Sequence, residues 1–184
     1  DVNIAFANEL SMICDSLKID VWELIRLANR HPRVNILKPG PGVGGHCIAV
    51  DPWFIVSSAP ETSKLIHSAR KVNNIKPDWI IDKVYAAVDE FLSNNPKKNI
   101  TDLTVACFGI AFKPDIDDLR ESPALSIVET LTKEINCKFF VVEPNIKYLP
   151  KSLEKCDLIE PKDVPSNCFD IALLLVNHKE FNTF

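Results

Sequence analysis

Residues 104–112 read Thr-Val-Ala-Cys-Phe-Gly-Ile-Ala-Phe, a short run that is apolar at nearly every position. A run of this kind predicts a buried strand. Ser122-Pro123 then opens a helix that we expect to reach about Ile135, because proline is favoured in the first helical turn. Further strands are predicted at 138–142, 157–159 and 171–176. Strand–helix–strand alternation predicts a Rossmann-like parallel sheet, which we expect to be truncated where the sequence stops.

The beginning of the chain has the apolar spacing of helices. Within residues 1–30, apolar side chains recur every three or four positions. Asp20 fits as the N-cap of a second helix over 21–30, and Glu23 completes a capping box. His31-Pro32 should end this helix, because a residue before proline avoids the helical conformation.

A longer helix is predicted from about residue 63 to 92, and Pro77 is expected to break or kink it. The wide apolar stripe of this helix favours packing against a second subunit, so we expect a homodimer formed through the helical region. An ordinary core helix is the alternative. The polar segment 94–99 has the composition of a linker. We therefore predict an α/β protein with an all-helical domain at 1–97 and a parallel-sheet domain at 98–184.

Composition excludes several classes of protein. The 184 residues carry a formal net charge of −4 without a basic stripe, which argues against a nucleic-acid partner. No apolar run approaches the roughly 20 residues that span a bilayer, so we expect no membrane segment. The opening residues lack the basic region of a signal peptide and an initiator methionine. We expect a piece of a longer protein.

The six cysteines do not form any C-x-x-C pair, which argues against a zinc ribbon or a thioredoxin-type site, and we predict no metal site. Cys14 and Cys107 lie in apolar runs, where a free thiol packs like a small hydrophobic residue. We interpret these two, together with Cys137, Cys156 and Cys168, as structural. Reduced thiols in a cytoplasmic protein are favoured over a disulfide framework.

Cys47 differs from the other cysteines because it follows a glycine cluster. Four of the five glycines of the chain lie within positions 40–45. Tight turns and close approach to a ligand are the usual reasons for such clustering. A thiol on such a turn can be exposed and reactive, although a buried structural cysteine is the alternative. Asp51 lies four residues on, and its carboxylate could act on a water or proton near the sulfur if the chain turns back.

Two long segments carry a family resemblance. GPGVGGHCIAVDPWFIV at 40–56 resembles the catalytic-cysteine signature of the UDP-glucose/GDP-mannose dehydrogenase family. FGIAFKPDIDDLRESPAL at 108–125 resembles the phosphate-and-sugar-binding segment of the same family, and DVNIAFANEL at 1–10 resembles the start of its central helical domain. His46 and the VDPWF segment look most like the branch that oxidises UDP-N-acetylmannosamine. UDP-N-acetylglucosamine, UDP-glucose or a non-catalytic sugar-nucleotide-binding or dimerisation module are the alternatives.

The resemblance implies a four-electron oxidation of a sugar C6 alcohol to a carboxylate, with two NAD used in succession. Cys47 is then the nucleophile that captures the intermediate aldehyde as a thiohemiacetal, and the oxidised thioester is hydrolysed. Asp51 matches the aspartate associated with water activation. By the same analogy, the product feeds a surface polysaccharide.

The resemblance also implies binding roles for other residues. Arg120 matches an arginine that contacts NAD, with an ion pair to Asp117, Asp118 or Glu121 as the alternative. A solvated charge is the alternative for Arg33, and an exposed loop lysine for Lys113. His67 and His178 carry no signal of function. The residues that the resemblance assigns to the UDP-sugar are His31, Arg33, Gly44, Phe112 and Lys113.

Some parts of the family pattern are expected outside this sequence. The main NAD-binding domain, with the catalytic lysine and its nearby asparagine, is expected before Asp1, and a late arginine is expected after Phe184. We therefore expect that the 184-residue chain alone does not oxidise a UDP-sugar, even with NAD supplied.

Overall fold

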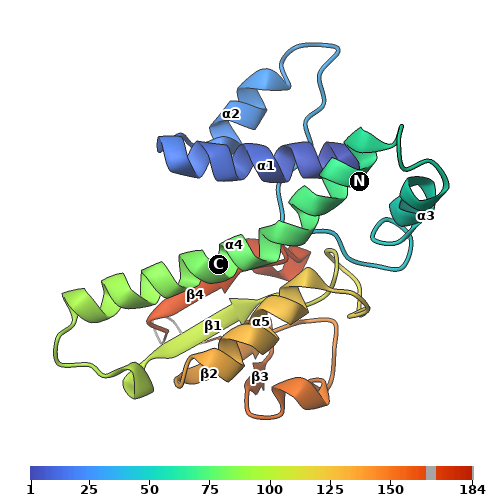
Figure 1. Ribbon diagram of the computed structural model, residues 1–184. Helices are drawn as coiled ribbons and strands as arrows, with labels where there is room; N and C mark the ends of the chain where they lie inside the picture. The colour runs from blue at the N-terminus through green and yellow to red at the C-terminus, as the bar shows by residue number, and fades with distance from the viewer. Residues whose placement is uncertain (165–168, 184) are drawn as a thin grey trace. The chain divides into compact units, whose positions relative to one another are not determined.

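A computed structural model describes residues 1–164 and 169–183 of the chain (Figure 1). The chain forms two compact units, Asp1–Lys76 and Pro77–Phe184. The described helices include none with the length and apolarity that a membrane crossing requires.

The first unit is helical. It contains α1 (Val2–Leu17), α2 (Val21–Ala28), α3 (Asp51–Ser58) and the beginning of α4 (Lys64–Asn94). The predicted N-cap of α2 is confirmed, because the Asp20 carboxylate accepts hydrogen bonds from the backbone N–H groups of Trp22 (2.8 Å) and Glu23 (3.3 Å). Helix α3 was not predicted, although Pro52 in its first turn is a helix-start signal.

Pro77 was expected to break or kink the long helix; the break is wrong, since α4 continues through this residue, and the kink stays a prediction. Proline removes one backbone hydrogen bond from a helix. Side chains on both sides of Pro77 are buried, namely Asn73 in the first unit and Ile81 and Val84 in the second. The helix therefore persists through a residue that would end an isolated one.

Buried polar side chains join α1 to α4 in the first unit. The Asn8 amide donates to Asn73 Oδ1 (2.9 Å), and the Asn73 amide donates to Asp1 Oδ1 (2.8 Å). Asn8 Oδ1 also accepts the backbone N–H of Gly40 (2.8 Å). The start of the glycine cluster is therefore fixed to a fully buried side chain of α1.

Lys76 is buried at the end of this unit, where its ammonium group donates to Ser11 Oγ (2.7 Å). Burial lowers the pKa of Lys76 to about 8, and the charge of Asp15 only partly opposes this shift. Between that pKa and the ordinary value of 10.5, the folded state binds fewer protons than the unfolded state. The free energy of unfolding should therefore rise with pH across this range, as the penalty for burying the charge disappears.

Urea unfolding of Lys76→Met at a series of pH values from neutral to 10.5 should show a weaker rise than the unsubstituted chain. Lys71→Met is the matched control, because Lys71 is exposed on the same helix. The same pH dependence in both variants would contradict the assignment to Lys76.

The second unit contains a parallel sheet, as predicted. Its strands are β1 (Thr104–Phe108), β2 (Lys138–Val142), β3 (Asp157–Ile159) and β4 (Ile171–Leu174), in the order β3-β2-β1-β4. Helix α5 (Pro123–Glu134) connects β1 to β2 (Figure 1). The short 3-10 helices are η1 (Ile100–Asp102), η2 (Lys151–Leu153), η3 (Pro161–Asp163) and η4 (Lys179–Thr183).

The core of the second unit lies on one face of this sheet. Alternate residues of β1 (Val105 and Cys107) and β2 (Phe139 and Val141) belong to a single apolar cluster with α5. The same cluster includes Ile81, Val84 and Val88 of α4. The later part of α4 thus packs with the sheet. The predicted domain boundary at 97/98 concerns the domains of the whole protein and stays a prediction.

Strand β1 is shorter than predicted. It ends at Phe108, and Gly109 has a φ of +80° that turns the chain out of the strand. Ile110 and Ala111 are fully buried beyond this point, but their backbone leaves the sheet. Strand β4 also ends earlier, at Leu174 rather than Val176. The carboxyl end of β1 therefore opens into a loop over 109–121, which we call the phosphate loop for the role proposed below.

Candidate functional site

The glycine cluster leads into a turn that carries Cys47. Gly42 and Gly45 have φ values of 141° and 80°, which favour glycine. The Cys47 thiol is free and its residue is exposed, not packed into a core. The Cys47 carbonyl accepts hydrogen bonds from the backbone N–H groups of Val50 (3.0 Å) and Asp51 (2.8 Å). The chain therefore turns back once after the thiol, and Asp51 begins α3 one turn from Cys47.

His31 and Arg33 lie together in the turn after α2. Both are exposed, and the Arg33 backbone N–H donates to His31 Nδ1 (3.2 Å). Asn29 fixes this turn, because its side chain both donates to the Ile36 carbonyl (2.9 Å) and accepts the Ile36 N–H (2.7 Å). Gly44 is half-buried within the glycine cluster. The structure thus places His31 and Arg33 on one loop and Gly44 and Cys47 on another, with Asp51 at the first position of α3.

The other predicted residues lie on the phosphate loop, at the carboxyl end of a parallel strand, where sheets of this kind bind ligands. The backbone N–H of Phe112 donates to the Asp118 carbonyl (3.1 Å), which closes the loop on itself. The Lys113 ammonium group is 5.5 Å from the centroid of the half-buried Phe112 ring, and Lys113 is exposed. The Lys113 ammonium group is therefore presented beyond the carboxyl end of β1.

Arg120 is exposed and pairs with Asp118, as the alternative interpretation allowed. Its guanidinium donates to the Asp118 carboxylate at 2.7 and 3.0 Å. The hydrogen bond and the charge of Asp118 raise the pKa of Arg120 above its ordinary value. Contact between Arg120 and NAD stays a prediction.

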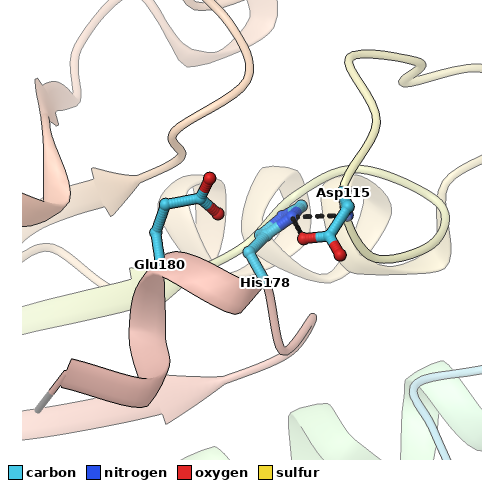
Figure 2. Close-up of side chains that lie close together, drawn as sticks. All are labelled: Asp115, His178 and Glu180. Atoms are coloured by element: carbon cyan, nitrogen blue, oxygen red, sulfur yellow. Dashed lines mark hydrogen bonds and ion pairs between the residues drawn. The ribbon is translucent and has the colours of Figure 1, made fainter.

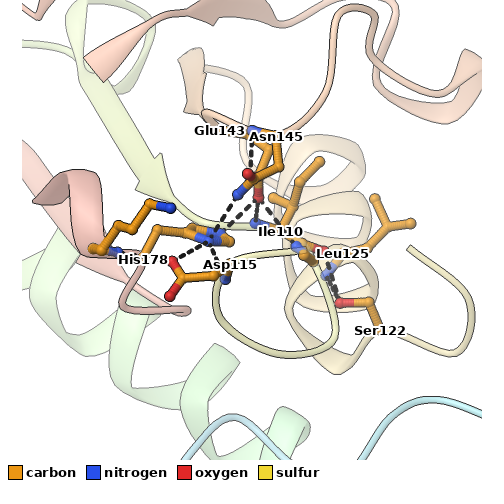
Figure 3. A network of polar contacts seen from close by, with 9 residues as sticks. Ile110, Asp115, Ser122, Leu125, Glu143, Asn145 and His178 are labelled. Carbon is orange, nitrogen blue, oxygen red and sulfur yellow. Dashed lines mark hydrogen bonds and ion pairs between the residues drawn. The ribbon is translucent and has the colours of Figure 1, made fainter. Parts of the chain in front are cut away.

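Two functional candidates were missed by sequence reasoning. Glu143 directly follows β2 and His178 follows β4, and both are buried, with exposures of 1% and 0%. Glu143 Oε2 lies 3.1 Å from His178 Nε2 and accepts the backbone N–H of Ile110 at 2.8 Å (Figure 3). The available signal was their position, since an acid and a histidine each come just after a parallel strand.

Hydrogen bonds keep the Glu143 carboxylate ionised. Burial alone raises the pKa of Glu143, but the hydrogen bonds from His178, Ile110 and Asn145, together with the electrostatic attraction of His178, outweigh it, so the pKa lies below its ordinary value. This carboxylate contributes stability that is present above its unfolded-state pKa. That contribution is lost as the pH falls through the lowered folded-state pKa.

Asp115, His178 and Glu180 form a group whose possible ligand atoms lie within 4.8 Å of one another (Figure 2). His178 Nδ1, however, accepts the backbone N–H of Asp115 (2.9 Å), and Nε2 faces Glu143. A cation would need a ring lone pair that is already used. The geometry therefore favours a hydrogen-bonded structural group over a metal centre.

The described cysteines, namely Cys14, Cys47, Cys107, Cys137 and Cys156, are all free. Cys14 and Cys107 are buried, while Cys137 and Cys156 are half-buried. Burial raises the pKa of the Cys107 thiol and raises that of Cys137 to about 11. The Cys107 and Cys137 thiols are therefore protonated at neutral pH. Among the described cysteines, Cys47 is the exposed one. Cys168 lies outside the described residues.

Two regions of the chain match profiles of one protein family. Residues 1–75 match the UDP-glucose/GDP-mannose dehydrogenase family, central domain. Residues 106–184 match the UDP-glucose/GDP-mannose dehydrogenase family, UDP binding domain. The first match contains the Cys47 turn, and the second contains the phosphate loop.

Individual relatives agree with these matches. The chain is 57% identical over 181 residues to a UDP-N-acetyl-D-mannosamine dehydrogenase of Yersinia pestis. This alignment covers 98% of this chain and 43% of that protein. The chain is 56% identical to an NDP-N-acetyl-D-galactosaminuronic acid dehydrogenase of Ralstonia solanacearum, over 98% of this chain and 40% of that protein. The structure of the UDP-N-acetyl-mannosamine dehydrogenase Cap5O from S. aureus superposes with a TM-score of 0.77 at 39% identity, over 98% of this chain and 39% of that one.

The chain thus spans less than half of the length of these relatives. Within that span, the helical unit, the parallel sheet and both signature segments fall where the family profiles match. The chain belongs to the UDP-glucose/GDP-mannose dehydrogenase family.

Proposed function

We propose that this chain supplies the catalytic thiol and the UDP-sugar site of an NAD-dependent nucleotide-sugar 6-dehydrogenase. The observation that carries the proposal is the exposed Cys47 on a glycine-rich turn, with Asp51 one helical turn away. A structural cysteine would gain stability by burial, as Cys14 and Cys107 do. An exposed thiol on a constrained turn is instead accessible to a substrate carbon.

The proposed reaction takes the C6 alcohol to an aldehyde and then to an acid. The Cys47 sulfur adds to the aldehyde carbon and gives a thiohemiacetal, which loses a hydride and a proton to become a thioester. Water then breaks the C–S bond, which releases the carboxylic acid and restores the thiol. Asp51, at the first position of α3, is proposed to accept the proton of that water.

NAD is the electron acceptor implied by the family, and it would take the hydride at each stage. The described sheet does not offer a complete site for it, because β1 is followed by Gly109-Ile110-Ala111 and not by a G-x-G-x-x-G turn. We therefore place the main NAD site outside this chain. Within the chain we assign only Arg120 to the cofactor, at the cost of its pairing with Asp118.

UDP-N-acetyl-D-mannosamine is the substrate that we propose. The 57% identity to a dehydrogenase named for this sugar supports it. The relative named for a galactosaminuronic acid is 56% identical, so overall identity does not separate the sugars. NADH release by the complete dehydrogenase across a set of UDP-sugars tests the proposal. A clear preference for UDP-N-acetylglucosamine or UDP-glucose would replace the substrate without changing the reaction.

The diphosphate is proposed to bind at the phosphate loop, beside Phe112 and Lys113. Calorimetric titration of the 184-residue chain with UDP should show binding. Lys113→Ala should weaken that binding about tenfold, because a charge-assisted contact to phosphate is lost. Lys133→Ala is the matched control, since Lys133 is an exposed lysine in the last turn of α5. Equal affinities for the two variants would exclude Lys113 from the site.

The partner proposed for the helical unit is a second copy of the chain. Phe6, Ile13 and Leu17 recur at a spacing that places them on one face of α1, and they are 52%, 48% and 62% exposed. A contiguous exposed apolar stripe marks an interaction surface. Analytical ultracentrifugation should give a dimer for the unsubstituted chain and a monomer for Ile13→Glu. Lys18→Glu, which changes a charge at the end of the same helix, should stay dimeric.

A cytoplasmic location is proposed on the state of the thiols. The five described cysteines are all free, and burial protects Cys14 and Cys107 from oxidation. Free thiols persist in reducing compartments.

A further inference from the structure

Glu143 and His178 hold the first half of the phosphate loop at two points, and we call them the buried pair. At the start of the loop, Glu143 Oε2 accepts the backbone N–H groups of Ile110 (2.8 Å) and Ala111 (3.2 Å). Further along, His178 Nδ1 accepts the backbone N–H of Asp115 (2.9 Å). Figure 3 shows these contacts converging on one point beyond the ends of the strands.

The segment between these two anchors is short and carries the proposed ligand contacts. Only Phe112, Lys113 and Pro114 lie between Ala111 and Asp115. Phe112 is half-buried and Lys113 is exposed, so neither is fixed by a core of its own. The course of the backbone, and with it the position of the Lys113 ammonium group, is therefore set by the buried pair.

The hydrogen bonds fix the protonation pattern of the pair. Because Nδ1 of His178 accepts an obligatory backbone donor, the ring proton must lie on Nε2. Nε2 can then donate to Glu143 Oε2 at 3.1 Å. Glu143 Oε1 accepts the backbone N–H of Asn145 (3.1 Å), so donors surround both carboxylate oxygens. An ionised Glu143 carboxylate therefore has a donor for each of its oxygens.

Two further contacts close the arrangement. Asp115, which has a φ of 62°, also binds the backbone that follows His178, because its carboxylate accepts the Lys179 N–H (2.9 Å). Ser122, which caps α5, donates to the Ile110 carbonyl (2.7 Å). Segments that follow β1, β2 and β4 are thereby joined, and the loop is supported from each of them.

We propose that Glu143 and His178 are positioning residues for nucleotide-diphosphate binding, which act by holding Lys113 at the ligand. This inference rests on the proposed binding of UDP at the phosphate loop. The pair does not touch the ligand in this account, since both side chains are buried. Loss of either half of the pair releases one end of the segment 112–114, and Lys113 then contributes little to binding.

Substitutions of His178 can separate its two contacts. The Asn side chain places an acceptor near the position of Nδ1, and so His178→Asn keeps the contact to the Asp115 N–H. The longer Gln side chain reaches towards Glu143 in place of Nε2, and so His178→Gln keeps that contact and loses the one to the loop. UDP affinity should fall about tenfold in His178→Gln and by less than about threefold in His178→Asn. Amide hydrogen exchange of Asp115 should accelerate only in His178→Gln. A purely structural role predicts that affinity follows the loss of stability in both variants.

A double-mutant cycle with Lys113→Ala gives the decisive result. If His178 acts through Lys113, the double variant His178→Gln/Lys113→Ala should bind UDP about tenfold more weakly than the unsubstituted chain, like either single variant. A roughly hundredfold loss, the product of two independent effects, would overturn the positioning role and leave the UDP site intact. Absence of UDP binding by the unsubstituted chain would instead overturn the proposed site itself.

Discussion

Cys47→Ser should reduce NADH formation by the complete dehydrogenase roughly a thousandfold or more, which is the scale of losing a covalent nucleophile. Serine keeps the size of the side chain on the turn that Gly42 and Gly45 allow, but its hydroxyl is protonated at neutral pH. The aldehyde is then not captured, and the second oxidation lacks its thioester. NADH fluorescence with UDP-N-acetyl-D-mannosamine measures the effect. Cys156→Ser, at a half-buried thiol, should leave the rate unchanged.

Alkylation provides an independent check on Cys47. Iodoacetamide at neutral pH should modify Cys47 before the buried Cys14 and Cys107, and peptide mass mapping identifies the site. UDP-sugar should slow the modification. If Cys47 is unreactive and Cys47→Ser retains full activity, the chain is a non-catalytic sugar-nucleotide-binding or dimerisation module.

Gly109→Ala should lower the free energy of unfolding of the sheet unit by about 3 kcal/mol or prevent its folding. A Cβ atom at this position would lie 2.4 Å from the Val176 carbonyl oxygen and 2.6 Å from the Val176 Cβ. The φ of +80° adds strain that alanine cannot relieve. The backbone N–H of Val176 donates to the Phe108 carbonyl. Neither Gly109 nor Val176 can therefore move away without breaking this contact between the end of β1 and the segment after β4.

Urea unfolding followed by circular dichroism measures this loss. Gly40→Ala is the matched control, because a Cβ there meets nothing within 4 Å and the N–H that Asn8 accepts is retained. This control should change the free energy of unfolding by less than about 1 kcal/mol. A Gly109→Ala variant as stable as Gly40→Ala would show that the close approach to Val176 is not required.

The sheet was predictable because its strands are short apolar runs with polar flanks. The bounds of β2 and β3 agree with the sequence prediction. The prediction for β1 ran too far because Ile110 and Ala111 are as buried as the strand itself, although their N–H groups bond Glu143 instead of a neighbouring strand. Hydrophobicity reports burial, and it does not report which backbone partner a segment has. Helix α3 was missed because its apolar residues are consecutive and mostly exposed, as Trp53, Phe54 and Ile55 are, and so they show no helical period.

The residues of the candidate site likewise fall into a group that the sequence predicted and a group that it did not. Cys47 and Lys113 could be found because each lies within a continuous motif. Glu143 and His178 lie in no such motif and were missed, because they are 35 residues apart and meet only when the parallel order brings the ends of β2 and β4 to either side of β1. Asn29 gives its turn the same kind of support through Ile36, and a lone asparagine carries no local signal. Sequence motifs therefore revealed the groups that we propose to face a ligand, whereas the groups that support them required the fold.

Anchoring through main-chain N–H groups has a consequence for the evolution of this loop. Glu143 and His178 recognise the peptide backbone of Ile110, Ala111 and Asp115, which is the same for almost any residue type. In the proposed site, exchanges at positions 112 and 113 would change the groups offered to the nucleotide while these anchoring contacts stay the same. Ligand preference and the course of the loop would then depend on separate sets of residues, so that one could change without disturbing the other.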